Sequence, residues 1–268
     1  MSEIKQMTIK EGDIIMDYCT FGEGEKPFVI LPGMSLRSVL NFSGAIAEQF
    51  SRIAKLYRVY VFDRRKLFPE DYSVRQMAHD TAAVMKAVGI KEAVLYGASQ
   101  GAMIAQWIAI DHPELAGRLV LCSSSSRETE RSHRLMVCWE EMARAGRLEE
   151  LVKSFCDVLY TPVYVKANAG ISAGLCEGVT KEDLDRFAQM ARATMTDNSY
   201  YELEKISCRS LVVGAWKDQV IGPEGSIELA RKLKCDTYID GTYGHAVYDE
   251  MPGFVDCICD YLMESERK

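Results

Sequence analysis

Five short, continuous apolar runs recur along the chain, and each is followed by residues that punctuate a strand. They are Phe28–Leu31, Val59–Phe62, Ala93–Tyr96, Leu119–Cys122 and Leu211–Gly214. A strand with one solvated face would alternate apolar and polar residues, whereas an uninterrupted run is typical of a strand buried on both faces. The five runs therefore predict the inner strands of a sheet that is covered on both sides.

Segments of helical periodicity separate several of these runs. Residues 73–88 place apolar side chains on one helical face, and residues 103–110 do the same after the third run. Strands that alternate with helices imply right-handed crossovers and a mostly parallel sheet, so the predicted fold class is α/β. Two β-leaning runs, 3–10 and 13–21, precede this pattern and predict a hairpin at a sheet edge.

The alternation stops after the fourth apolar run. Between Ser123 and Ser207 we expect helices at 134–145, 148–160 and 181–195 and no buried strand, with Ser123–Ser126 as an exit linker. A strand, a helix (225–234), a strand (235–239) and a last helix (252–263) then complete the core. We therefore predict an α/β core over 1–123 and 208–268, with a helical insertion over 124–207.

Charge and cysteine content exclude several classes of protein. The 268 residues carry 32 basic and 39 acidic side chains, a net charge of −7, and the longest basic run is Arg64–Lys66. Nucleic acid and anionic membrane surfaces are therefore not expected partners. Nine cysteines without a C-x-x-C pair favour reduced thiols over disulfides or a zinc site. The first residues resemble no secretion signal and no apolar stretch reaches 18 residues, so we expect a soluble, cytoplasmic protein.

The most specific motif is Gly97-Ala98-Ser99-Gln100-Gly101, a G-x-S-x-G pattern with a buried run before it and a helical segment after it. A direct turn from strand into helix forces its middle residue into a strained conformation, and the glycines avoid collisions with the neighbouring strand and helix. Ser99 is therefore expected to project above the carboxyl edge of the sheet, where ligands of open α/β sheets bind.

A serine hydroxyl needs a base to become a nucleophile, and an acid that orients the base. Of the four histidines, His245 lies in a glycine-punctuated loop after the last strand, whereas the other three fall in or beside predicted helices. Asp218 follows the last of the five apolar runs and is the expected acid. Asp240 is a rival, but it lies so close to His245 in sequence that we expect it to serve the turn.

The order Ser99, Asp218, His245 resembles that of the α/β-hydrolase superfamily of capped serine hydrolases. Phe28–Met34 and His112-Pro113-Glu114 add local signatures. The resemblance implies an eight-stranded sheet, a lid inserted after the sixth strand, and acyl-enzyme chemistry. It also implies an oxyanion hole formed by the backbone N–H groups of Met34 and Gln100. Where many members have His-Gly, this chain has Pro32-Gly33, so hydrogen bonding behind that loop should differ.

The residues beside these motifs indicate an apolar substrate. Met34, Trp216 and Val220 flank the expected catalytic positions and predict a pocket for an apolar or aromatic acyl or alcohol group. The aromatic residues of the insertion are Trp139, Phe155, Tyr160, Tyr164, Phe187, Tyr200 and Tyr201. Some of them should face the cleft, but the sequence does not say which. No arginine or lysine flanks the motifs in a way that calls for a carboxylate or phosphate substrate.

The leading interpretation is a serine hydrolase that cleaves a small ester or related acyl bond without a metal or organic cofactor. A carbon–carbon bond hydrolase or an acyltransferase with the same triad is the alternative among enzymes. A non-catalytic ligand-binding protein on the same fold is the alternative outside them. The oligomeric state is left open by the sequence.

Overall fold

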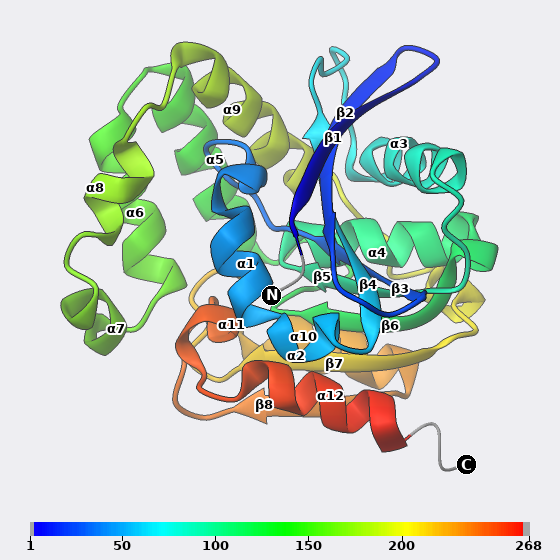
Figure 1. The fold of residues 1–268 in the computed structure, drawn as a ribbon. Helices are drawn as coiled ribbons and strands as arrows, with labels where there is room; N and C mark the ends of the chain where they lie inside the picture. Colours follow the sequence, from blue (N-terminus) through cyan, green and yellow to red (C-terminus); the bar gives the residue numbers. More distant parts are fainter. Residues whose placement is uncertain (1–2, 265–268) are drawn as a thin grey trace.

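One eight-stranded sheet forms the centre of the molecule (Figure 1), which a computed structural model describes over residues 3–264. The strands are β1 (Lys5–Glu11), β2 (Ile14–Phe21), β3 (Lys26–Leu31), β4 (Tyr57–Arg65), β5 (Ala93–Ala98), β6 (Ala116–Cys122), β7 (Arg209–Ala215) and β8 (Asp236–Asp240). Their order is β1-β2-β4-β3-β5-β6-β7-β8. Strands β1 and β2 form an antiparallel edge hairpin, and β3 to β8 pair in parallel. The predicted mostly parallel sheet is confirmed.

The parallel register brings several strand ends to one edge. Leu31 pairs with Gly97, and Cys122 pairs with both Ala98 and Val213. The segments that follow β3, β5, β6 and β7 therefore start side by side at the carboxyl edge of the sheet. This edge holds the candidate site.

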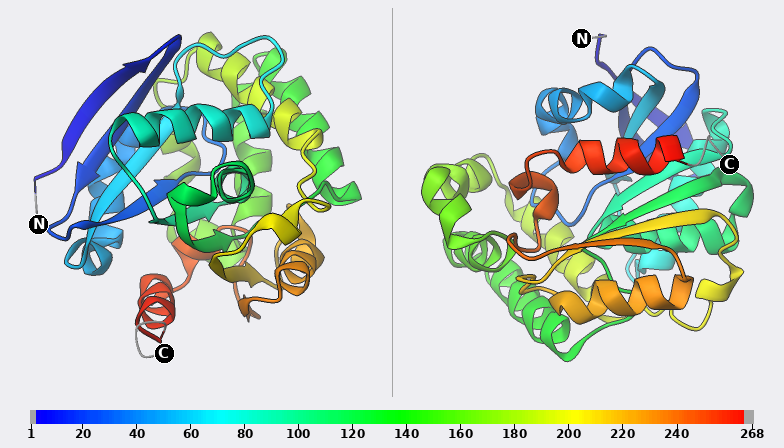
Figure 2. Two further views of the ribbon diagram at one scale, coloured as in Figure 1. Left: turned by 90° about the vertical axis from the view of Figure 1, so that its right-hand side faces the viewer. Right: turned by 90° about the horizontal axis from the view of Figure 1, so that it is seen from below.

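Helices cover both faces of the sheet, as the uninterrupted apolar runs predict. One face carries α1 (Ser43–Gln49), α2 (Ser51–Ala54) and α12 (Phe254–Glu264), and the other carries α3 (Val74–Ala87), α4 (Gln100–Asp111) and α10 (Gly222–Leu233). The right-hand view of Figure 2 shows α12 and α10 on opposite sides of the strands. Short helices η1 (Val39–Phe42), η2 (Pro113–Leu115), η3 (Leu203–Lys205) and α11 (Val247–Glu250) complete the core.

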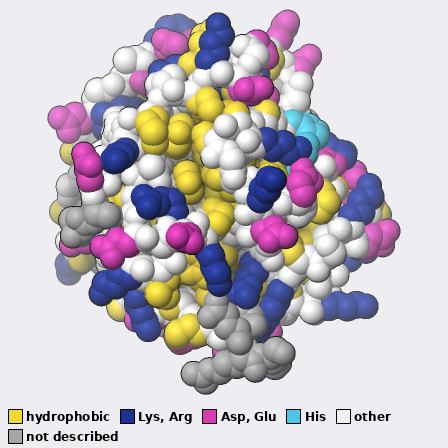
Figure 3. All heavy atoms as spheres, turned by 45° about the vertical axis from the view of Figure 1, so that its right-hand side comes forward, with side chains coloured by type: hydrophobic (Ala, Val, Ile, Leu, Met, Phe, Trp, Pro, Cys, Tyr) yellow, Lys and Arg dark blue, Asp and Glu magenta, His cyan; other side chains and the backbone are white. Residues whose placement is uncertain are grey.

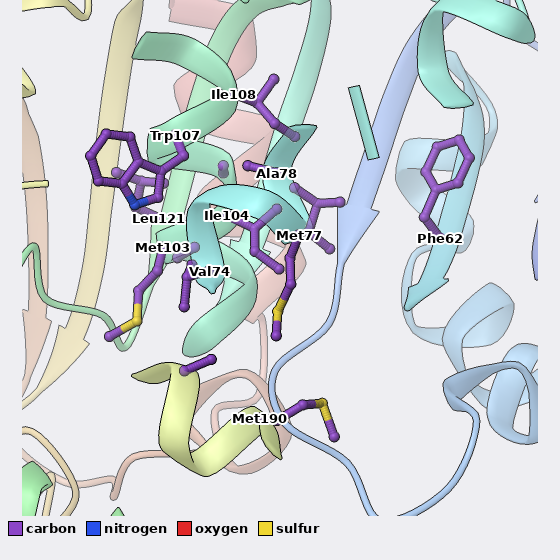
Figure 4. Packing of buried hydrophobic residues seen from close by; sticks show 14 of the residues in the cluster. Phe62, Val74, Met77, Ala78, Met103, Ile104, Trp107, Ile108, Leu121 and Met190 are labelled. Atoms are coloured by element: carbon purple, nitrogen blue, oxygen red, sulfur yellow. The ribbon is translucent and has the colours of Figure 1, made fainter. Parts of the chain in front are cut away.

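Alternate residues of each inner strand belong to opposite cores. Val29 and Leu95 pack on the α3/α4 side, while Ile30 and Val94 pack on the α1/α12 side. Figure 4 shows the first of these cores between α3 and α4, with Met190 at its border. Residues 100–110 of α4 are all buried, because α4 lies between the sheet, α3 and the helices that follow β6.

Local signals fix where α3 begins. Ser73 caps this helix: its hydroxyl accepts from the Gln76 N–H, and the Gln76 side chain accepts from the Ser73 N–H. This capping box satisfies two N–H groups, one of which has no partner within the helix. Because the cap and the apolar face agree, the predicted helix over 73–88 and the observed one match within a residue at each end.

The chain between β6 and β7, called here the β6–β7 segment (residues 123–208), is helical. It contains α5 (Glu130–Arg144), α6 (Leu148–Leu159), α7 (Pro162–Ala167), α8 (Ile171–Cys176) and α9 (Lys181–Met195). Figure 1 shows these helices together at one end of the sheet. Its first residues, Ser123 to Ser126, lead from β6 toward α5 and are all at most 1% exposed.

The surface carries both signs of charge. On the face drawn in Figure 3, Lys and Arg side chains are interspersed with Asp and Glu. Among residues 3–264, no helix is long and apolar enough to cross a membrane.

Candidate active site

Ser99 lies at the turn from β5 into α4 with backbone angles of φ 52° and ψ −123°. A non-glycine residue at positive φ is strained by about 1–3 kcal/mol and persists only where its surroundings hold it. Those surroundings allow no side chain at the flanking glycines. A Cβ at Gly97 would overlap the backbone of Ala102, and one at Gly101 would overlap the carbonyl oxygens of Leu31 and Pro32. The motif thus forms the sharp turn that its spacing predicts.

The structure brings Ser99, His245 and Asp218 together. His245 Nε2 lies 3.0 Å from Ser99 Oγ, and His245 Nδ1 lies 2.8 Å from Asp218 Oδ2. His245 and Asp218 are 2% and 3% exposed, whereas Ser99 is only partly buried. The contact between Ser99 Oγ and His245 Nε2 is short enough for proton transfer from a nucleophile to a base, and the contact between Asp218 and His245 Nδ1 is a hydrogen bond that can orient that base.

The Asp218 carboxylate is fixed on both of its oxygens. While Oδ2 faces His245, Oδ1 accepts the backbone N–H groups of Val220 (2.8 Å) and Ile221 (3.0 Å). Asp240, the rival acid, instead accepts the Tyr238 hydroxyl at 3.2 Å and the Thr242 N–H. It therefore serves the turn after β8, as the sequence predicts.

Buried serines after β6 support the two loops of the site. Ser123 Oγ donates to the His245 carbonyl at 2.5 Å, and Ser124 Oγ donates to the Ser99 carbonyl at 3.1 Å. The exit linker is therefore buried, and its first two hydroxyls hold both candidate catalytic loops, because this segment passes beneath them. Its composition alone resembled a loop, and only the position of β6 between β5 and β7 gives it this place.

The loop after β3 lies directly against Ser99. A Cβ added to Gly33 would stand 3.3 Å from both the Ser99 Cβ and the Ala98 carbonyl oxygen, so only glycine allows this approach without a shift. Met34 follows in the same loop. Gln100 is the first residue of α4, so its N–H is one of the four that have no partner within the helix. Both expected oxyanion donors thus lie in segments that adjoin Ser99.

A narrow pocket opens onto Ser99. It is lined by Gly33, Met34, Ser99, Met136, Trp139, Phe155, Leu159, Val220, His245 and Tyr248. Its free volume of about 20 Å³ holds roughly one water molecule. Four of these lining residues come from α5 and α6, so these helices close over the site. Met34 and Val220 are in the wall, as expected.

Trp216 is a correction to the expected pocket. Its side chain is 57% exposed and is not part of the wall. It follows β7 directly, and its backbone N–H donates to the Asp240 carbonyl, which extends the pairing of β7 with β8. Sequence reasoning missed Tyr248, which lies three residues after His245 and reaches the pocket because α11 begins there.

The pocket wall is uncharged. It contains no lysine, arginine, aspartate or glutamate side chain among the described residues. Burial raises the pKa of the Tyr248 phenol, so that group stays neutral near pH 7. Beneath the site, burial likewise raises the pKa of the Cys122 thiol.

The other three histidines lie away from the site. His79 on α3 contacts His112, which follows α4, and His133 on α5 pairs with Glu128, which precedes that helix. Within residues 3–264, no cluster of three or more His, Cys, Asp and Glu side chains is arranged to hold a metal ion.

Residues 26–143 match the family model described as the alpha/beta hydrolase fold. The strand order and the turn at Ser99 agree with this match, because both fit the same fold. The chain has the fold of the α/β-hydrolase superfamily. Among curated relatives, it is 22% identical to 3-oxoadipate enol-lactonase 2 of Acinetobacter baylyi over 80% of this chain and 79% of that protein.

Solved structures of this superfamily have the same fold over nearly the whole chain. An α/β hydrolase from a Medee basin deep-sea metagenome library matches with a TM-score of 0.85 and 19% identity, covering 96% of this chain and 97% of that one. The enol-lactonase from Burkholderia xenovorans LB400 matches with a TM-score of 0.84 and 20% identity, covering 96% and 100%. These likenesses show the fold, and the family match together with the curated relative indicates an α/β-hydrolase enzyme.

Proposed function

We propose that this α/β hydrolase cleaves a small, uncharged ester through a covalent acyl-Ser99 intermediate. The observation that carries the proposal is the continuous chain of short contacts from Asp218 through His245 to Ser99. A protein that only binds its ligand has no need of a buried carboxylate that fixes a histidine against a strained serine.

In the first step, Ser99 Oγ attacks the ester carbonyl carbon while His245 Nε2 takes the hydroxyl proton. Asp218 keeps the other imidazole nitrogen protonated and stabilises the imidazolium. The carbonyl oxygen becomes an anion, and the N–H groups of Met34 and Gln100 would hold it. The intermediate then expels the alcohol, which leaves with the proton from His245. Water, deprotonated by the same histidine, attacks the acyl-Ser99 and releases the acid.

Two observations support an ester of small, uncharged groups. The pocket wall carries no charged side chain, so it offers no partner for a carboxylate or phosphate on the substrate. The named relatives include enol-lactonases, and a lactone is a cyclic ester. Because the wall offers no charged partner, we infer a neutral substrate for this chain.

We also propose that residues 124–207 act as a cap whose α5 and α6 move to admit the substrate. A pocket of about 20 Å³ is too small for an ester. Met136 and Trp139 on α5 and Phe155 and Leu159 on α6 would have to shift to make room.

Active-site labelling with a fluorophosphonate, together with hydrolysis of p-nitrophenyl esters of increasing chain length, tests the proposal. We expect label on Ser99 and turnover of short esters. Ser99→Ala and His245→Ala should each lower kcat by about 10³-fold or more with near-normal folding. His133→Ala is the matched control and should keep full activity, because its side chain is 53% exposed and takes no part in the pocket wall. Full activity in either active-site variant would refute the assignment.

A further inference from the structure

Arg64 is a buried arginine behind the candidate oxyanion loop. It lies near the end of β4 and is 6% exposed. Its Nη2 donates to the Pro32 carbonyl at 2.8 Å and to the Gln100 side-chain oxygen at 3.3 Å. One nitrogen thus contacts both segments that carry the expected oxyanion donors.

The partners of Arg64 are neutral. Among the described residues, no carboxylate lies within ion-pair distance of its guanidinium, although the Asp63 charge is nearby. Burying an unpaired cation is costly, so a protein rarely contains one without compensation. Its neighbour Arg65, also buried, shows the ordinary arrangement, with ion pairs to Asp13 and Asp80.

Gln100 extends the network into the β6–β7 segment. Its side-chain nitrogen donates to the Met190 carbonyl at 2.9 Å and to Thr194 Oγ1 at 2.8 Å, both on α9. Thr194 Oγ1 in turn contacts Met34 Sδ at 3.6 Å. Arg64, Gln100 and α9 therefore surround the loop that carries Met34.

In this loop Pro32 has no N–H and no polar side chain, so its carbonyl is its one hydrogen-bonding group, and Arg64 holds it. We propose that Arg64 is the positioning residue of the oxyanion hole in this chain. Its guanidinium holds the Pro32 carbonyl and the Gln100 side chain, and so fixes the two N–H groups that receive the developing negative charge. The inference rests on the proposed function, since it assumes that an oxyanion forms on the Ser99 adduct.

The test compares Arg64→Met and Arg64→Lys with Arg65→Met, a matched change at the neighbouring buried arginine. Kinetics with p-nitrophenyl butyrate separate kcat from KM. Inhibition by phenylboronic acid reports on the oxyanion hole, because its Ser99 adduct is tetrahedral and anionic. Inhibition by 4-phenylbutan-1-ol, which has no carbonyl, reports on the pocket alone. Thermal melting checks that each variant is folded.

We expect Arg64→Met to lower kcat by about 10- to 100-fold, because misplaced donors lose transition-state stabilisation. Phenylboronic acid should bind more weakly by a similar factor, while KM and alcohol inhibition change less than about threefold. Lysine offers a point charge in place of the planar guanidinium, so kcat of Arg64→Lys should fall by about 3- to 10-fold. Arg65→Met should melt at a lower temperature with unchanged kcat.

The inference is overturned if an Arg64 variant that is folded keeps kcat within twofold of wild type. It is also overturned if boronic acid and alcohol binding weaken together, or if Arg65→Met loses kcat as much as the Arg64 variants. Failure of the proposed function looks different, because the unaltered protein would then hydrolyse no ester, or Ser99→Ala would remain active.

Discussion

Replacing Asp218 by asparagine should abolish most of the activity while the protein stays folded. Asparagine has the same shape, and its side-chain oxygen can keep the bonds from the Val220 and Ile221 N–H groups. The amide NH₂ group would then take the place of Oδ2, 2.8 Å from His245 Nδ1. An NH₂ group donates hydrogen bonds and cannot accept one from Nδ1–H, so the imidazole adopts the tautomer in which Nδ1 is the acceptor.

The wrong tautomer carries its hydrogen on Nε2, the atom that lies 3.0 Å from Ser99 Oγ. Nε2 then cannot take the serine proton, and we expect kcat to fall about 10⁴-fold. At about 1.36 kcal/mol for each factor of ten, this is about 5.5 kcal/mol of transition-state stabilisation. Steady-state hydrolysis of p-nitrophenyl butyrate measures the loss, and circular dichroism with a melting curve confirms the fold.

Asp240→Asn is the matched control, because Asp240 holds the turn after β8 and does not contact His245. It should keep at least half of the wild-type kcat. The reasoning fails if Asp218→Asn retains more than a tenth of the wild-type kcat, or if Asp240→Asn loses as much activity as Asp218→Asn.

Three further predictions concern the turn at Ser99, the pocket and one buried carboxyl. Gly101→Ala should lower the free energy of unfolding in urea by at least about 3 kcal/mol, because the added Cβ would overlap backbone oxygens. Gly44 on α1 has open space around its Cα, so Gly44→Ala should be neutral or stabilising. Phe155→Ala should enlarge the pocket and so raise the ratio of kcat/KM for the p-nitrophenyl hexanoate ester to that for the acetate ester by at least about tenfold. Phe68 lies outside the pocket, so Phe68→Ala should leave this ratio unchanged. An unchanged ratio in Phe155→Ala would contradict the assignment of the wall. Burial raises the pKa of Asp197 from 3.8 to about 6, so the native state binds this proton more tightly than the unfolded chain. The free energy of unfolding should therefore fall as the pH rises from 3.8 to about 6, and then level off. The difference between wild type and Asp197→Asn in urea titrations should show this fall, and a difference independent of pH would refute it.

Much of the fold could be predicted from the sequence, because burial leaves local patterns. Continuous apolar runs located the inner strands, and an apolar helical face located α3 within a residue at each end. The expected strand at 59–62 was too short: β4 continues to Arg65, since its last residues are charged yet buried. A pattern based on apolar character cannot detect a strand whose polar groups are satisfied by tertiary contacts.

For the site, the sequence indicated the three residues that the structure brings together, because strand ends at one edge of a parallel sheet must converge. Ser99, Asp218 and His245 each follow a strand, and the parallel register sets those strand ends side by side. Backbone pairing therefore brings such distant residues to the same edge of the sheet.

Only the tertiary structure decided what surrounds these three residues. Trp139 and Phe155 face the pocket while Phe187 is buried in the core and Trp216 points to solvent. Arg64 reaches Pro32 and Gln100 because β3, β4 and α4 meet behind the site. Sequence periodicity reports which face of an element is buried, but the neighbour on that face depends on how separate elements cross. That crossing is fixed by packing over the whole chain.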